Sequence, residues 1–266
     1  MIIVSGTKRS GTSLWMHLLV QAGLPLIGER FPRGWGDLLK DANPDGFFES
    51  ELVSGIYHRT NPHPLTGAYL APQQTRTHVV KVFIPGLVRT DVAFIDRCVA
   101  TVRSWREYVV SVQRMQALSG EDAGEQLPPA LEWWVNNYGL IRDLAIRGYP
   151  AHVVSFDSLL RDPQRVVTET LAWIGHGDPS RICELVRPER AGSRRASSPD
   201  EALADGIDPR HLAVFDELHH IIDTEGALSG AFIETLNRTD EALRPMVLER
   251  RATIEAATVA DILARG

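Results

Sequence analysis

The sequence predicts an α/β protein in which helices cover a parallel sheet, and three observations support this. Short apolar segments typical of buried strands recur along the chain, and segments with helical spacing of apolar residues follow them. A glycine-rich turn joins the first of these strands to the first helix. The composition, 44% hydrophobic and 23% charged over 266 residues, is that of a globular protein with one large core or two small ones.

The predicted strands and helices alternate through the first two thirds of the chain. A long loop rich in glycine, proline and aspartate is expected at 24–50. Strands are expected at 1–4, 78–83, 98–102 and 151–156. Helices are expected at 12–22, 51–59, 105–118, 128–147 and 162–175.

The last quarter of the chain has a different character. From about Ser197 it becomes rich in alanine, glutamate and leucine, with helical segments expected near 208–223 and 226–262. We therefore predict an α/β core over 1–195, with 196–266 as a C-terminal helical extension of the same domain rather than a second catalytic domain.

Composition narrows the possible partners. The net charge of −6 argues against a nucleic-acid partner. Cys98 and Cys183 lie far apart and lack metal-binding spacing, so no metal site is expected. No apolar run reaches the roughly 18 residues of a membrane span. The first apolar run is short and ends at Gly6, so we do not expect a signal peptide. We expect the protein to be cytoplasmic. No motif indicates an oligomeric state.

The turn after the first strand, GTKRSGTS, has the features of an anion site. A glycine-rich turn that runs into a helix presents free backbone N–H groups at the positive end of the helix dipole. Gly6 and Gly11 permit the turn, and Lys8 and Arg9 supply positive charge within it. The alternative is a tight strand-to-helix turn without a ligand, which the two cations make less attractive.

The same turn differs from the loop that binds ATP or GTP. In that loop a lysine follows the second glycine and reaches the β- and γ-phosphates, whereas this chain has Thr12 there. A cation at Arg9 would instead reach a shorter anion.

The stretch KRSGTSLWMHLL resembles the 5′-phosphosulfate loop of sulfotransferases that use 3′-phosphoadenosine 5′-phosphosulfate (PAPS), in the R-S-G-T form of tyrosylprotein and bacterial members. The resemblance implies a P-loop-like fold and PAPS as co-substrate. It places Arg9 beside the oxygen that bridges phosphate and sulfate. Leu14 stands where another form of the loop has a tryptophan that stacks on adenine. The residues assigned to the cofactor here are Lys8, Arg9, Ser10, Gly11, Thr12, Ser13 and Leu14.

Three further stretches resemble parts of the same family. Arg103 ends a strand and Ser111 follows eight residues later, the spacing of the family's 3′-phosphate ligands. Phe156 stands where a tyrosine usually lines the adenine pocket. The stretch ERAGSRR resembles the family's late basic loop, which closes on the 3′-phosphate. Arg194 and Arg195 are therefore candidate ligands of that phosphate. For these two arginines, a solvated basic loop is an equal alternative.

The residue that removes the acceptor's proton is the open question. KVFIP matches the family's K-T-H-L-P motif at Lys81 and Pro85, but Phe83 stands in place of the basic histidine. Lys81 is expected at the sulfuryl group. The stretch NPDGFFESELV resembles bacterial members that use a carboxylate, so Glu49 is the candidate base. Other candidates are Glu51, His58 and His63.

The resemblance leads to one expected function and two alternatives. It implies a sulfotransferase that moves a sulfuryl group from PAPS to an acceptor hydroxyl by in-line displacement, without a metal. Aromatic residues near the long loop suggest a lipid, phenolic or natural-product acceptor; they are Trp35, Phe47, Phe48 and Tyr57. The alternatives are a P-loop ATP-dependent kinase and a catalytically silent nucleotide-binding or interaction module, which Phe83 keeps open.

Overall fold

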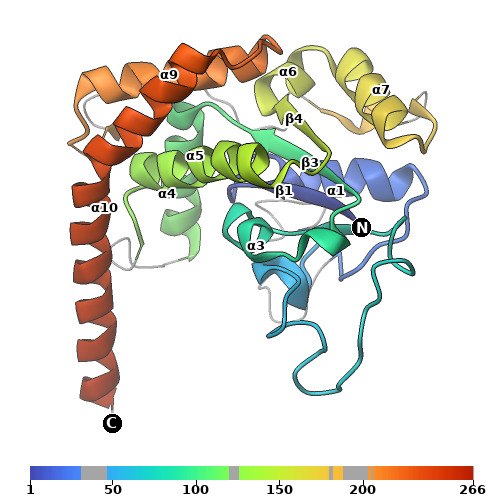
Figure 1. Cartoon of the computed structure of the whole chain (residues 1–266), viewed down its shortest axis with the longest axis horizontal. Coiled ribbons are helices and arrows are strands. Elements are labelled where there is room, and N and C mark those ends of the chain that lie inside the picture. Colours follow the sequence, from blue (N-terminus) through green and yellow to red (C-terminus); the bar gives the residue numbers. More distant parts are fainter. Residues whose placement is uncertain (31–46, 120–125, 180–181, 188–202, 205, 266) are drawn as a thin grey trace.

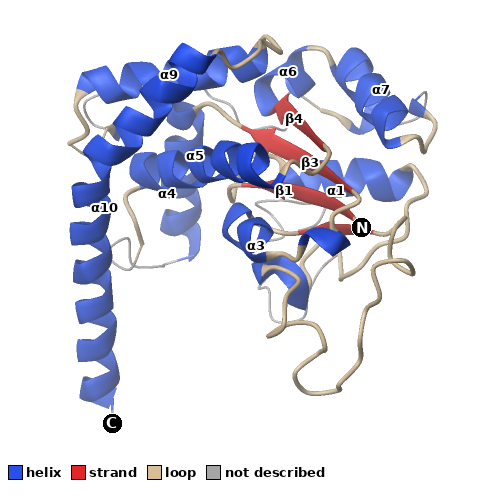
Figure 2. Cartoon of the chain, in the orientation of Figure 1, coloured by secondary structure: helices blue, strands red, loops and turns tan. Residues whose placement is uncertain are grey.

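The computed structural model describes residues 1–30, 47–119, 126–179, 182–187, 203–204 and 206–265. Four parallel strands form one sheet in the order β2-β1-β3-β4, and helices flank it (Figures 1 and 2). The predicted α/β fold class is therefore confirmed. The strands are β1 (Ile2–Gly6), β2 (Val79–Lys81), β3 (Arg97–Val102) and β4 (Ala151–Ser155).

The two faces of the sheet bury alternate side chains of each strand, as the period of two in a strand requires. Val4 and Val99 face one apolar cluster, whereas Ile3 and Ala100 face the other. The first face is covered by α1 (Thr12–Gln21), α6 (Phe156–Arg161) and α7 (Pro163–Ile174). The second is covered by α3 (Ile84–Arg89), α4 (Trp105–Ser119) and α5 (Pro129–Arg147).

The prediction of a helix at 51–59 is wrong. A short 3-10 helix, η1 (Glu51–Ser54), ends at Gly55, whose φ is 109°. A Cβ at Gly55 would lie 2.4 Å from the carbonyl oxygen of Gly86, so the two backbones pack too closely for a helix to continue. The described residues also form the 3-10 helices η2 (Val92–Phe94) and η5 (Cys183–Leu185).

The C-terminal extension packs into the second cluster through two helices, α9 (Pro209–Asp223) and α10 (Gly230–Arg265). The Phe215 ring of α9 stacks on Trp134 at 4.8 Å and contacts Trp133 at 5.4 Å between centroids. Both tryptophans are fully buried. Figure 1 shows the later turns of α10 running beyond the body of the molecule. In the described part of the chain, every helix is too short or too polar to cross a membrane.

Removing the Phe215 ring should destabilise the whole domain, because the ring packs against Trp133, Trp134 and also Trp105, whose ring centroid lies 6.4 Å away. We expect Phe215→Ala to lower the free energy of unfolding by about 3–5 kcal/mol, measured by urea denaturation. Leu248→Ala, at an exposed position of α10, is the control and should change it by less than about 0.5 kcal/mol. Equal effects of the two substitutions would show that α9 is not part of the core.

Candidate functional site

The carboxyl ends of the four parallel strands meet at one edge of the sheet, where ligands bind in open α/β folds. The strand register pairs Val4 with Lys81, Gly6 with Thr101 and Val102 with Ser155. The segments that follow the strands therefore lie side by side in the order of the sheet. From β2 to β4, the strand ends and these segments carry Lys81, which ends β2, then the turn at 7–11, Arg103 and Phe156.

The turn at 7–11 is held by short contacts that require glycine. Gly11 has a φ of 99°, and a Cβ there would lie 2.3 Å from the Phe156 ring. The Ser10 hydroxyl donates to the carbonyl of Thr7 at 2.7 Å, and Thr101 donates to the carbonyl of Ser10 at 2.9 Å. Ser10 therefore shapes the turn, and its side chain is buried and engaged.

Alanine at Gly11 should disrupt this turn, because it adds a clash with Phe156 to the strain of a left-handed backbone. We expect Gly11→Ala to lower the free energy of unfolding by about 1–3 kcal/mol more than Gly148→Ala does. Gly148 is the matched control, since its φ is 62° but a Cβ there would meet nothing within 4 Å. Equal losses in the two variants, measured by chemical denaturation, would contradict the close packing of Phe156 on the turn.

Helix α1 begins directly after the turn and presents its first N–H groups to the same edge. The N–H groups of Thr12, Ser13 and Leu14 have no carbonyl partner within the helix, as at any helix start. The Ser13 hydroxyl donates to the carbonyl of Phe47 at 3.1 Å. Leu14 packs against the apolar cluster beneath α1. The backbone, more than these side chains, is available to an anion.

Arg9, Arg103 and Ser111 gather on the β3 side of the turn. Arg9 donates to the Ser111 hydroxyl at 3.1 Å, and Arg103 donates to the carbonyl of Arg9 at 3.3 Å. Arg103 also pairs with Glu107 at 3.0 Å and lies over the Phe156 ring at 5.1 Å. The resemblance implies that Arg103 and Ser111 bind one phosphate; in the structure both of them contact Arg9.

Positive charge is concentrated and only partly neutralised in this cluster. Burial lowers the pKa of Arg9, and the nearby charges of Arg103 and Arg114 lower it further. The Nε atom of Arg103 is buried and has no hydrogen-bond partner in the described part of the chain. A bound anion would relieve both the charge repulsion and the unpaired donor.

Arg114 and Glu107 are members of this cluster that the sequence reasoning did not identify. They share a face of α4 with Ser111, because Glu107, Ser111 and Arg114 follow one another at intervals of four and three residues. This helical spacing is the sequence signal that could have identified Glu107 and Arg114.

Lys8 points away from this cluster, toward α5. Its ammonium group lies 3.6 Å from Glu132 and also contacts Gln126. Glu132 in turn accepts a hydrogen bond of 2.7 Å from Tyr108. The structure therefore pairs Lys8, which the resemblance assigns to the cofactor loop, with Glu132 of α5.

Lys81 and Glu49 form an ion pair on the β2 side of the turn. The Lys81 ammonium contacts the Glu49 carboxylate and donates to the carbonyl of Phe47 at 2.7 Å. Burial lowers the pKa of Lys81; Glu49 opposes this shift, and the charge of Arg9 adds to it. Phe48, between Phe47 and Glu49, has a φ of 50°, a strained conformation that turns the chain at the site.

The other candidate bases lie elsewhere. Glu51 contacts His63 and its side chain is 74% exposed, whereas the His58 ring meets Tyr57 edge-on at 5.4 Å. Among the described residues, none of these three candidates pairs with Lys81. Phe48 is buried in the core beneath α1, so it does not contribute to an open apolar wall. Arg194, Arg195 and Trp35 lie outside the described residues.

No protein-family model matches the chain, and no curated protein matches it. One solved structure with a partly similar backbone is the sulfotransferase domain from the Synechococcus PCC 7002 olefin synthase. It shares 15% sequence identity over 90% of this chain and 93% of that chain, with a TM-score of 0.41. Because this likeness is only partial, the function proposed below depends on the site residues themselves.

Proposed function

We propose that this protein is a sulfotransferase that uses PAPS and an acceptor with a free hydroxyl group. The observation that carries the proposal is the concentration of Arg9, Arg103 and Ser111 beside the first turn of α1, with Lys81 on its other side. This arrangement suits a nucleotide with anionic groups at two positions. Thr12, where an ATP-binding loop has the lysine that reaches the β- and γ-phosphates, argues against a nucleoside triphosphate as the ligand.

In the proposed complex the 5′-phosphosulfate lies at the start of α1. The backbone N–H groups of residues 10–14 bind the 5′-phosphate, and Arg9 and Lys81 approach the sulfuryl oxygens. The acceptor oxygen attacks sulfur, and the bond from sulfur to the bridging phosphate oxygen breaks. The products are a sulfate ester and 3′-phosphoadenosine 5′-phosphate (PAP). The two cations stabilise the negative charge that grows on the departing phosphate.

The 3′-phosphate takes the place beside Arg103 and Ser111. Arg103 can turn its unpaired Nε and its guanidinium fork toward the phosphate oxygens. The ring of Phe156, which packs against Arg103, forms part of the wall for the nucleoside. Arg194 and Arg195 remain candidates for the loop that closes over this phosphate.

Glu49 accepts the proton of the acceptor hydroxyl in this proposal. Its contact with Lys81 directs the carboxylate at the site. When the donor binds, Lys81 can exchange Glu49 for a sulfuryl oxygen, which leaves the carboxylate free to accept a proton. Phe83 lies over the Lys81 ammonium at 5.1 Å and cannot itself act as a base.

The proposal is tested by an assay of PAP release with PAPS, EDTA and a panel of lipid, phenolic and natural-product alcohols, with mass spectrometry of the products. We expect PAP and a sulfate ester to form together, only when an acceptor is present. Consumption of ATP with magnesium and no use of PAPS would instead indicate the kinase. Nucleotide binding without turnover on any acceptor would indicate the silent module.

A further inference from the structure

We infer that helix α9 of the C-terminal extension positions the two segments that carry Arg103 and Phe156, through Asp216, His219 and Asp223. This inference rests on the proposed function for the identity of the ligand. The three residues lie on one face of α9, at intervals of three and four. Each of them contacts a segment that follows either β3 or β4.

Asp216 holds the segment that follows Arg103. It accepts a hydrogen bond from the Trp105 indole at 2.8 Å and contacts the Arg106 guanidinium. Trp105 is fully buried and begins α4, so its indole fixes the first turn of that helix. Arg103 lies two residues earlier, and its carbonyl accepts a hydrogen bond of 2.7 Å from Trp133.

His219 reaches the same segment through Asp157. His219 Nε2 lies 2.9 Å from Asp157 Oδ2, and that oxygen also accepts a hydrogen bond of 3.3 Å from the N–H of Ser104. Burial alone would raise the pKa of the Asp157 carboxyl, but His219, the Ser104 N–H and Arg103 outweigh burial, so the pKa is lowered. Asp157 directly follows Phe156, and it therefore connects the β3 and β4 segments.

Asp223 holds the segment that follows β4. It accepts hydrogen bonds from Ser155 at 2.6 Å and Ser158 at 3.0 Å, and pairs with Arg161 at 3.0 Å. Ser155 also caps helix α6, because its hydroxyl oxygen accepts from the N–H groups of Asp157 and Ser158. The cap fixes the start of the helix at which Phe156 lies.

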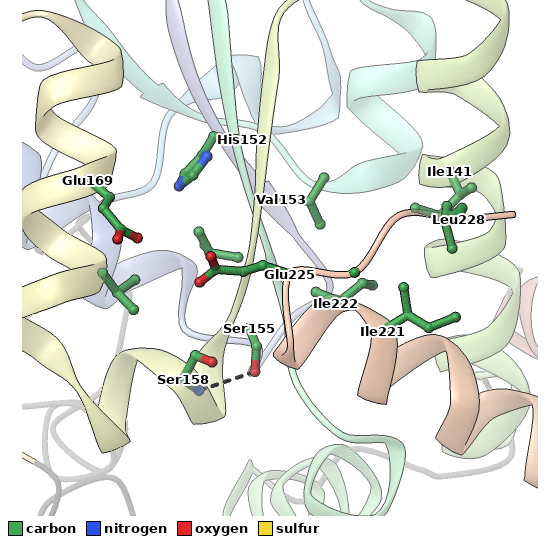
Figure 3. Close-up of a pocket in the computed structure, with 13 residues that line it drawn as sticks. Ile141, His152, Val153, Ser155, Ser158, Glu169, Ile221, Ile222, Glu225 and Leu228 are labelled. Carbon is green, nitrogen blue, oxygen red and sulfur yellow. Dashed lines mark hydrogen bonds between the residues drawn. The ribbon is translucent and has the colours of Figure 1, made fainter.

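Side chains do not fill the space between the end of α9 and β4. A cavity of about 410 Å³ lies there, lined by Ser155 and Ser158 on one side and by Ile221 and Ile222 on the other. Figure 3 shows these residues around the cavity, with Glu225 reaching across it. Where side chains do not fill the space, the polar contacts of Asp223 set the relative position of the two elements.

Two pairs of neighbouring residues give matched variants. Asp216→Ala and His219→Ala remove contacts with the Arg103 segment, whereas Glu217→Ala and His220→Ala change exposed positions of the same helix. We expect the preference for PAP over adenosine 5′-phosphate, measured by calorimetry, to fall about fivefold in the first two variants and to stay unchanged in the controls. A general loss of stability would weaken both nucleotides equally and leave the preference unchanged.

Hydrogen exchange in the ligand-free protein separates this inference from the proposed function. We expect the amides of 103–107 to exchange faster in Asp216→Ala and His219→Ala than in either control. If the wild-type protein binds neither nucleotide, the proposed function fails, and faster exchange would still show that α9 positions the segment. Exchange at the control rate would overturn the inference. So would an unchanged nucleotide preference in a wild-type protein that binds PAP.

Discussion

Replacing Arg9 with methionine should reduce kcat/KM for PAPS by about 10²–10³-fold, because Arg9 is proposed to contact the charge that develops between phosphate and sulfur. The stability of the ligand-free protein should change little. Burial and the charges of Arg103 and Arg114 lower the pKa of Arg9, so its removal takes away a repelled cation as well as a hydrogen bond to Ser111. Loss of activity and retained stability are therefore expected together.

Two further substitutions sharpen this experiment. Arg9→Lys keeps the charge but loses the planar fork, and it should recover only part of the activity. Arg89→Met, at the exposed end of α3, is the control for loss of one positive charge and should behave as wild type. The proposed role of Arg9 would be wrong if Arg9→Met kept at least half of the wild-type kcat/KM.

Replacing Glu49 with glutamine should lower kcat by about 10²–10⁴-fold, the range for loss of a general base. The affinity for PAP should stay near that of wild type, because PAP carries no acceptor and its proposed ligands are elsewhere. Glu51→Gln is the matched control, since Glu51 is exposed and contacts His63. Full activity of Glu49→Gln, or an equal loss in Glu51→Gln, would assign the base to another residue.

The same substitution has a consequence for stability that depends on pH. Glu49 opposes the lowering of the Lys81 pKa, so Glu49→Gln should lower that pKa further and leave a buried ammonium without its partner. A lysine whose pKa is lowered by folding reduces stability fully below the folded pKa; the loss shrinks as the pH rises above that value and is gone above the unfolded pKa. We therefore expect the variant to lose stability near pH 7 and to approach wild type near pH 10. The double variant Glu49→Gln/Lys81→Met should regain stability at pH 7 without regaining activity.

The sequence predicted the elements whose signals are local. Apolar strands and the glycines at 6 and 11 were enough to predict the turn at the start of α1, and the strand pattern implied a parallel sheet. The site segments lie together because parallel strands end at one edge. This is why Arg9, Arg103 and Ser111 are neighbours although they are distant in sequence.

The structural features that the sequence did not predict depend on tertiary contacts. The Ser111 hydrogen bond to Arg9 and the engagement of Lys8 by Glu132 follow from how α4 and α5 pack. The chain does not continue as a helix after η1 because Gly55 lies close to Gly86, and no local sequence pattern predicts that contact. The polar contacts of α9 likewise join residues more than 60 positions apart, so no local pattern in the sequence predicts them.

The central claim is that the cluster around Arg9 binds a nucleotide with a 3′-phosphate and needs no magnesium. Isothermal titration with PAP in EDTA, compared with ADP in magnesium, tests it directly. The account predicts that PAP binds about tenfold more tightly or better, since one charge-assisted contact alone contributes about 1.5–3 kcal/mol, and that Arg103→Gln removes this preference. Tighter binding of ADP with magnesium, or an unchanged preference in Arg103→Gln, would contradict it.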